Sequence, residues 1–266
     1  MAGVEAALLP TLRDSMRNPS FWGYSTWLDI VIRYRRSTFG LAWILVPPAM
    51  YTLGMGYIYA SLQGRTPLDY MPHMGLGYVL FRTMAMVMVE ATSILPSLAG
   101  YIHDGNIRLT DCVLRVLFKA AFYLLVSMLV IVPVLLLSPV FRPEGLALGL
   151  LGLLLVGLNM AWLAGVLSLF GARYPDTHEF MGNVFIVGFL LTPILWYAKD
   201  APAGTVHGFL MRLNPAYHLV EIVRAPLLGE PVETVTVVVV VAGAVLGWAA
   251  WAWAFRRFSR FVALWI

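Results

Sequence analysis

Residues 146–170, LALGLLGLLLVGLNMAWLAGVLSLF, contain no charged side chain. A helix of this length crosses a membrane, because about 20 apolar residues span the roughly 30 Å of hydrocarbon in a bilayer. Five more apolar stretches lie along the chain, and the six occupy about 38–62, 75–98, 117–138, 146–170, 181–198 and 234–255. The pattern predicts an all-α, polytopic membrane protein with six transmembrane helices.

The composition of the whole chain agrees with this prediction. Hydrophobic residues make up 60% of the 266 residues and charged residues 12%, whereas a soluble domain carries about 25% charged residues. The chain has room for several spans but not for a large soluble domain. Its start has no apolar core of signal-peptide length, so we expect no cleavage there. A single cysteine, Cys112, excludes an internal disulfide and a cysteine-based metal cluster.

Basic residues are unevenly distributed between the two sides of a six-span topology. The termini and the loops on their side carry twelve Lys and Arg residues, the opposite loops carry five, and Arg82 lies inside a predicted span. Because cytoplasmic loops are enriched in Lys and Arg, this asymmetry places both termini in the cytoplasm. It also accounts for the net charge of +4, so we expect no nucleic-acid partner.

Residues 1–37 precede the first predicted span and are too polar to cross a membrane. Four apolar residues within 18–36 repeat at the spacing of one helical face, and they are Trp27, Ile30, Val31 and Tyr34. The same segment carries charged side chains, among them Asp29, Arg33 and Arg35. We therefore expect an N-terminal amphipathic helix in the membrane interface, followed by a membrane domain at 38–266.

The segment 203–229, between the fifth and sixth predicted spans, is more than a simple loop. Asn214 and Pro215 are typical of a helix start. Apolar residues then repeat on one face, and they are Leu219, Ile222, Val223 and Leu227. Glu221 and Arg224 are three residues apart and are placed to pair. We expect a re-entrant or interfacial helix pair on the outer side that borders a passage; simple interfacial packing is the alternative.

Two ionisable residues, Arg82 and Glu90, lie inside the second predicted span. Charges at such depth normally face a cavity or a partner. The two residues are about 12 Å apart along a helix and about 80° apart around it, so they are poorly placed to pair with each other. One hypothesis is that both line a polar passage. The alternative is that one of them lies at the membrane interface.

The first predicted span carries a stripe at i+4 spacing that consists of Phe39, Trp43, Pro47, Tyr51, Met55 and Tyr59. Sugar rings stack on aromatic faces, so the stripe is a candidate lining for a sugar passage, although such stripes usually serve packing. Small-xxx-small pairs occur in two other spans, at Gly145 with Gly149 and at Gly243 with Gly247. These pairs permit close helix packing.

The chain shows no ATP site. Its two lysines, Lys119 and Lys199, do not follow glycine as a phosphate-binding loop requires. The five histidines form neither an i, i+4 pair nor a His-Glu-x-x-His motif. We therefore expect no catalytic residue, no metal site and no bound cofactor, and a partner must supply the energy for active transport.

Five segments in chain order relate the sequence to a known family. They are RYRRSTFGLAWILVPPAMY from residue 33, YIHDGNIRLTDCVLRVLFK from 101, GARYPDTHEF from 171, LLTPILWYA from 190 and LNPAYHLVEIVRAPLLGEP from 213. Together they resemble the permease subunits of ABC-2-type transporters, in the branch that exports O-antigen, capsule and teichoic-acid polysaccharides. Arg82 and the run Met84, Met86 and Met88 depart from that pattern, which puts a detailed transfer of channel contacts in doubt.

The resemblance implies a homodimer in the bacterial inner membrane that exports a polysaccharide or lipid-linked glycan. It also implies two copies of a separate ABC ATPase, which bind the ATP and Mg. The residues expected to receive the ATPase motion are Asp29, Arg33, Arg35, Asp104, Arg108, Asp111, Arg115, Arg173, Tyr174 and Asp176. Those that match the outer gate are Asn214, Pro215, Glu221 and Arg224. The candidate channel residues are Phe39, Trp43, Tyr51, Tyr59, Arg82 and Glu90.

Three alternatives remain open. An ABC-2-type exporter of a drug or lipid has the same architecture, but the long aromatic interface helix and the LTPILW segment favour glycans. A polytopic membrane transferase requires an acidic pair or a membrane-facing histidine with a partner, and neither stands out. A membrane scaffold without transport is the third alternative.

Overall fold

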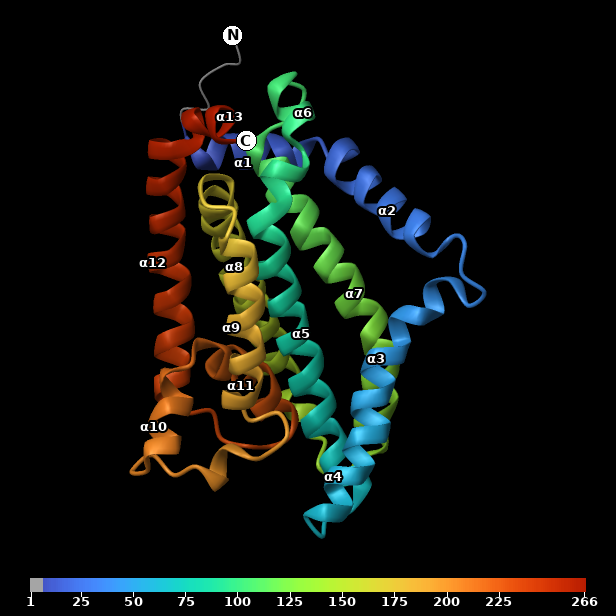
Figure 1. The fold of residues 1–266 in the computed structure, drawn as a ribbon. Coiled ribbons are helices and arrows are strands. Elements are labelled where there is room, and N and C mark those ends of the chain that lie inside the picture. Colours follow the sequence, from blue (N-terminus) through green and yellow to red (C-terminus); the bar gives the residue numbers. More distant parts are fainter. Residues whose placement is uncertain (1–6) are drawn as a thin grey trace.

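The structure, a computed structural model, describes residues 7–266. All regular elements in that range are helices, and the long ones form an elongated bundle (Figure 1). Five helical segments are long and apolar enough to cross a membrane, and they are Gly40–Leu62, Pro67–Ser97, Leu109–Leu137, Pro143–Arg173 and Thr234–Trp265. The prediction of an all-α membrane protein is therefore confirmed for the described residues, with five spans of the required length.

The predicted span 181–198 corresponds to a shorter helix. α9 (Thr177–Leu191) has 15 residues, which is about 22 Å of helix and less than the thickness of a hydrocarbon core. The helix stops because Pro193 disfavours a helical conformation in the preceding residue, and Thr192 is extended with a ψ of 133°. Residues 192–197 continue as irregular backbone up to the 3₁₀ turn η4 (Ala198–Asp200). The count of six spans is not confirmed by helix length.

The other long helices extend beyond the apolar stretches that predicted them. α5 (Pro67–Ser97) and α7 (Leu109–Leu137) each begin eight residues before the predicted spans. α8 (Leu146–Arg173), preceded by the 3₁₀ turn η3 (Pro143–Gly145), and α12 (Thr234–Phe258) begin where expected and run three residues further. Hydropathy marks only the part of a helix that suits hydrocarbon, so the polar ends of these helices were not included in the prediction.

The first span is a helix of changing geometry. It consists of the 3₁₀ segment η1 (Gly40–Leu45), the α-helical turn α3 (Val46–Ala49), the π-helical segment η2 (Met50–Met55) and α4 (Gly56–Leu62). Pro47 and Pro48 lack the N–H groups that a continuous α-helix needs at this point. Because the number of residues per turn changes along the span, side chains at i+4 spacing do not stay on one straight line.

α5 lies at the centre of the bundle and contacts α4, α7, α8 and α9. Glycines allow α8 and η3 to approach their neighbours. A Cβ on Gly247 of α12 would lie 2.0 Å from the ring of Trp162 in α8, and a Cβ on Gly145 would lie 1.8 Å from the carbonyl oxygen of Pro226. Both glycines belong to the predicted small-xxx-small pairs, so close packing is confirmed at these two positions.

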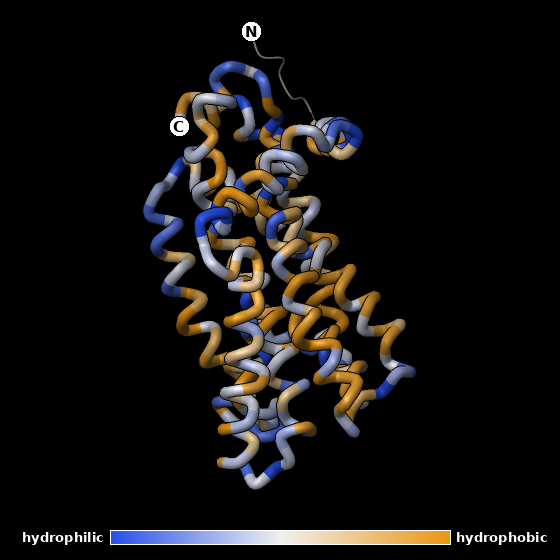
Figure 2. Tube along the Cα trace, turned by 90° about the vertical axis from the view of Figure 1, so that its right-hand side faces the viewer, coloured by the Kyte–Doolittle hydropathy of each residue, from blue (hydrophilic) through white to orange (hydrophobic). Residues whose placement is uncertain are grey.

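The first and last described helices lie at the same end of the bundle. α1 (Leu8–Arg17), α6 (Ala99–His103) and α13 (Val262–Trp265), which follows the turn η5 (Ser259–Phe261), lie at what we call the α1 end (Figure 1). α10 (Val206–Leu213) and α11 (Pro215–Leu227) lie at the opposite end, the α11 end. Figure 2 shows hydrophilic residues mainly towards the ends and hydrophobic residues dominating much of the bundle between them.

The predicted amphipathic helix is α2 (Ser20–Tyr34). Its apolar stripe packs on α7, where the Trp27 ring meets the Phe122 ring edge-on at 5.8 Å and the Tyr34 hydroxyl lies 3.2 Å from that of Tyr123. Ile30, between them, is 1% exposed. The helix and its apolar face are thus confirmed, and its place in the membrane interface stays a prediction.

Candidate functional site

Five aromatic rings from three helices meet on one side of the bundle. Tyr51 of the first span stacks on Tyr78 of α5 with ring centres 3.8 Å apart and planes 9° apart. Phe189 of α9 meets the Tyr51 ring at 6.2 Å and the Phe81 ring at 5.6 Å, and Phe185 also lies 5.6 Å from Phe81. We call these five residues the aromatic face. It joins α5 to the two segments that flank it, the first span and α9.

The remaining predicted channel aromatics lie elsewhere. Phe39 and Trp43 contact each other edge-on at 5.7 Å and are 68% and 46% exposed. Tyr59 packs beside a buried cluster at the α11 end that contains Tyr70. The i+4 stripe therefore brings only Tyr51 to the aromatic face, because the span changes its helical geometry between these residues.

The two predicted charges of the second span differ in their partners. Glu90 of α5 accepts a hydrogen bond from Lys119 Nζ of α7 at 2.7 Å, and both side chains are about one-fifth exposed. Arg82 follows Phe81 on α5 and forms no ion pair with any described residue. The sequence correctly indicated that the two do not pair with each other. The charge count assigned Lys119 to the cytoplasmic side together with the 99–116 loop, and the structure places it within α7 as the partner of Glu90.

A buried arginine connects three elements at the α11 end. Arg224 of α11 is 0% exposed and pairs through Nη2 with Glu221, as their i, i+3 spacing predicts. Its Nη1 donates to the carbonyl oxygen of Pro193 at 2.7 Å and to the backbone carbonyl oxygen of His73 on α5 at 3.4 Å. A single guanidinium thus holds α11 against both α5 and the irregular segment that follows α9.

Two further α5 side chains donate to the same irregular segment. The Tyr70 hydroxyl donates to the Leu195 carbonyl at 2.7 Å, and His73 Nε2 lies 3.0 Å from the Trp196 carbonyl. A carbonyl only accepts, so the His73 proton is on Nε2. We call Arg224, Glu221, His73 and Tyr70 the Arg224 cluster. Three of its members satisfy carbonyl groups that no helix satisfies in residues 192–197.

More charges and rings surround this cluster. Tyr197 stacks on His73 at 4.0 Å, and the guanidinium carbon of Arg65 lies 4.2 Å from the centre of the Tyr197 ring. Burial, and after it the nearby Glu221 carboxylate, raises the pKa of Glu230 above its ordinary value. The α11 end therefore holds several charges in a largely buried setting, where each depends on its neighbours.

The predicted gate residues Asn214 and Pro215 begin α11. Asn214 Oδ1 accepts from the backbone N–H of Ala216 at 3.0 Å, and its Nδ2 donates to the Thr192 hydroxyl at 2.8 Å. Pro215 occupies the first helical position, where no backbone N–H is needed. Both predicted features of the helix start are confirmed, and Asn214 also ties the start to the end of α9.

A cavity of about 290 Å³ lies beside Asn214, among α5, α8, α9, α11 and α12. Met84, Met88 and Met160 contribute to its lining. Two of them belong to the methionine run that departs from the family pattern, and flexible thioether side chains fill irregular space of this kind. The cavity lies next to the aromatic face, because Phe81 and Phe185 line it as well.

At the α1 end, the predicted coupling residues fall into two groups. Arg115 pairs with Asp29 and donates to the Ser25 hydroxyl at 3.3 Å, which fastens α2 to α7. Asp111 is 4% exposed. Its carboxylate accepts a hydrogen bond from the backbone N–H of Arg108 at 2.9 Å, and this contact caps the N-terminus of α7. Asp29 is itself exposed, and the other exposed residues of the set are Arg33, Arg35, Asp104, Arg173, Tyr174 and Asp176.

The C-terminal segment joins two of the predicted coupling loops. His103 of α6 lies with Nε2 3.0 Å from the Ala263 carbonyl, and the Arg173 guanidinium lies 5.9 Å from the centre of the Trp265 ring. No local sequence pattern indicates these contacts, which join positions far apart in the chain. Within residues 7–266, no group of three or more His, Cys, Asp or Glu side chains is placed to hold a metal ion.

The length and composition of the helices define a polytopic α-helical membrane protein, in which buried polar side chains are paired across helices. Residues 22–228, more than three quarters of the chain, match the ABC-2 type transporter family. The chain therefore belongs to the ABC-2 type transporter family and is a multi-pass membrane permease of an ABC transporter. Permeases of this family work with an ATPase partner. No curated protein matches the chain significantly.

Proposed function

We propose that this permease exports a polysaccharide or lipid-linked glycan, of the O-antigen type, across the bacterial inner membrane. The observation that carries the proposal is the aromatic face, with Arg82 next to it on α5, where Arg82 interacts with Tyr78 of that face and forms no ion pair with any described residue. Sugars present apolar C–H faces that stack on rings, and hydroxyl groups that accept hydrogen bonds from a guanidinium. A purely apolar lipid or drug has no hydrogen-bond acceptor for a guanidinium at membrane depth.

Six passes are consistent with the position of the first and last helices. A chain whose α1 and α13 lie at one end of a bundle crosses it an even number of times (Figure 1). The five long segments and α9 give six passes if residues 192–197 complete the crossing that α9 begins. With the twelve-to-five distribution of basic residues, both termini lie in the cytoplasm and the α11 end faces outward.

The exposed segments of the protomer support a homodimer. No residue of α9 is buried, and the first span exposes Met50 and Tyr57 by 65% and 59%. We therefore place a second copy of the chain, and the substrate passage, along the first span and α9.

The helix pair α10 and α11 closes the outer exit of this passage in our proposal. α11 is buried from Tyr217 to Leu227 among α5, α8 and α12, which fits a re-entrant helix better than one on the surface. Because the Arg224 cluster holds α11 to α5, any opening has to move these two helices together or break the cluster.

Two ATPase subunits, which bind ATP and Mg, dock at the α1 end in this proposal. The exposed coupling residues provide the contact, and the pair of Arg115 with Asp29 carries the motion from α7 to α2. Charge reversal at Asp176 or Arg108 should uncouple ATP hydrolysis from export. Normal coupling of such variants in reconstituted vesicles would remove this contact from the proposal.

The test of the substrate is ATPase stimulation, measured on the chain co-purified with its ATPase and reconstituted in lipid. A lipid-linked glycan should stimulate hydrolysis, and Phe189→Ala should reduce the effect. Phe180→Ala is the matched control, because Phe180 is on the same helix, is 62% exposed and lies outside the aromatic face.

Each other outcome contradicts the proposal in a distinct way. Stimulation by a drug or a phospholipid alone identifies a drug or lipid exporter. The absence of stimulation by any of the three classes points to a transferase or a scaffold. Equal losses in Phe189→Ala and Phe180→Ala would remove the aromatic face from the substrate path.

A further inference from the structure

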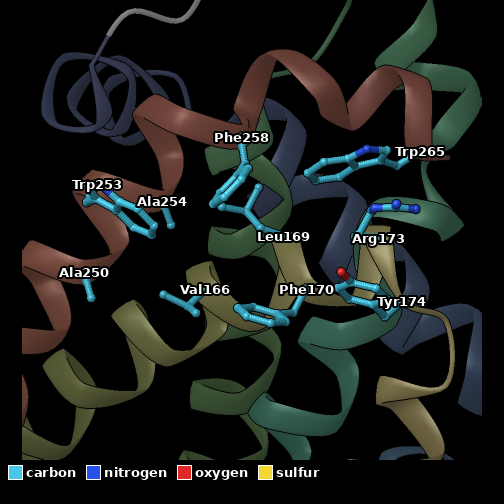
Figure 3. Close-up of a pocket in the computed structure, with 10 residues that line it drawn as sticks. All are labelled: Val166, Leu169, Phe170, Arg173, Tyr174, Ala250, Trp253, Ala254, Phe258 and Trp265. Carbon is cyan, nitrogen blue, oxygen red and sulfur yellow. The ribbon is translucent and has the colours of Figure 1, made fainter.

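A second cavity lies at the α1 end, away from the aromatic face. It has a volume of about 460 Å³ and lies between the last turns of α8 and the segment from α12 to α13 (Figure 3). Val166 and Leu169 of α8 face Trp253 and Phe258 of α12 across it. Its volume is within the range of about 300–1,000 Å³ that is usual for ligand pockets.

One charged side chain, Arg173, lines this otherwise largely apolar cavity. It is the last residue of α8, and no carboxylate in residues 7–266 forms an ion pair with it. The rings of Tyr174 and Trp265 lie 5.4 and 5.9 Å from its guanidinium carbon. An exposed guanidinium without a carboxylate partner is free to bind an anion.

The cavity has a polar end and an apolar end. Arg173 is at the end of the helix bundle, whereas Val166 is seven residues earlier, about 10 Å deeper along α8. Ala250 of α12 lines the deep part as well, whereas Phe258, the last residue of α12, lies at the same end of the cavity as Arg173 (Figure 3). A ligand that fits has a charged group at the membrane surface and an apolar chain directed towards the middle of the membrane.

Two more cations extend the positive charge at this end. Arg256 and Arg257 line a neighbouring cavity that shares Trp253 with the first. Basic pockets between transmembrane helices, close to the membrane surface, bind the phosphate groups of anionic lipids. Arginine suits this task because its planar guanidinium donates two parallel hydrogen bonds to one phosphate.

We propose that the cavity at Arg173 binds an anionic phospholipid from the surrounding bilayer. The guanidinium of Arg173 holds the phosphate, and one acyl chain lies between α8 and α12 against Val166 and Ala250. The lipid then fills the space between these helices and supports the C-terminal segment that lies over Arg173. This inference rests on the chain being a membrane protein, and it holds whichever substrate is exported. It assigns Arg173 to the lipid and leaves the ATPase contact to the other exposed coupling residues.

The test is native mass spectrometry of the full chain, released from detergent after exposure to equal amounts of phosphatidylglycerol and phosphatidylethanolamine. The wild type should retain phosphatidylglycerol preferentially. Arg173→Gln should reduce that preference by about fivefold, the factor expected for one arginine near an anionic headgroup, and Arg173→Lys should keep most of it. Arg142→Gln, which removes an exposed arginine elsewhere in the chain, should change nothing.

A second pair of variants tests the acyl chain. Ala250→Phe fills the deep part of the cavity and should reduce retention of both phospholipids. Val245→Phe adds the same ring to an exposed position of α12 outside the cavity and should leave retention unchanged. Because Ala250 is exposed and tolerates a larger side chain without disturbing the core, loss of folding does not explain the difference.

Three results would overturn the proposal. One is equal retention of the two phospholipids by the wild type, and another is an unchanged preference in Arg173→Gln. The third is release of phosphatidylglycerol when the ATPase partner or a second copy of the chain binds, because the cavity would then be a protein contact. Substrate-stimulated ATPase activity is measured separately, so failure of the lipid site leaves the proposed function intact.

Discussion

Removal of the Arg224 guanidinium should destabilise the permease more than any other single loss of charge at the α11 end. Arg224→Met leaves the Glu221 carboxylate, 8% exposed, without its cation and the Pro193 carbonyl without its donor. Breaking a buried ion pair from one side costs about 3–5 kcal/mol, and an orphaned buried carbonyl adds about 1–3 kcal/mol. We therefore expect Arg224→Met to lower the free energy of unfolding by at least about 3 kcal/mol.

The double variant Glu221→Leu/Arg224→Met separates the two contributions. It removes both charges, so only the orphaned Pro193 carbonyl remains and the loss should fall to about 1–3 kcal/mol. The assay is reversible unfolding of the full chain in mixed micelles with a rising fraction of SDS, followed by circular dichroism. Arg212→Met is the control at the same end, because its pair with Glu233 is partly exposed and such pairs contribute about 1 kcal/mol or less.

The reasoning is refuted if the double variant loses as much as the sum of its two single variants. Additive losses would mean that Arg224 and Glu221 do not interact, since contacting residues show coupling free energies of about 0.5–3 kcal/mol. A loss in Arg224→Met no larger than that in Arg212→Met would equally contradict the burial argument.

Three further predictions use the same unfolding assay. Lys119→Met should cost about 1–2 kcal/mol, because the pair is only partly buried. Glu90→Gln should cost less, since the glutamine Oε1 still accepts a hydrogen bond from Lys119 Nζ. Burial raises the pKa of Glu230, so the protonated carboxyl stabilises the folded state. This contribution is fully present below the ordinary pKa of glutamate and is lost as the pH rises through the raised value. Glu230→Gln should therefore flatten the decline of stability with pH, and an unchanged pH profile in the variant would contradict the prediction. Gly152→Ala places a Cβ 2.3 Å from a carbonyl oxygen of α11 and should cost about 1–3 kcal/mol, whereas Gly157→Ala on the same helix, with nothing within 4 Å, should be neutral.

The sequence predicted the features that depend on neighbouring residues. Hydropathy located the long helices, Asn214 and Pro215 marked the start of α11, and the i, i+3 spacing predicted the pair of Glu221 with Arg224. Each of these depends on a periodic or local pattern that a single helix imposes on its own residues.

Contacts between distant segments were not predictable in this way. The pairing of Glu90 with Lys119 joins two helices, and no pattern within either helix identifies the partner. The i+4 stripe failed for a different reason, because prolines and a π-helical segment change the geometry of the first span between Trp43 and Tyr59. In the proposed dimer, the surroundings of that span and of α9 include a second copy of the chain, which no pattern within a single sequence describes.

The short length of α9 and the buried polar residues at the α11 end have one physical explanation. A helix that ends at Leu191 leaves the carbonyl groups of Pro193, Leu195 and Trp196 without helical partners. Unsatisfied backbone groups are costly in a low-dielectric setting, so each of the three needs a donor, and the Arg224 cluster supplies all three. The charge of Arg224 then requires a buried anion, which Glu221 provides. The N-P-x-x-x-x-x-E-x-x-R segment thus has a structural reason within this chain that is independent of any gate, and a variant there that abolishes export must first be shown to fold.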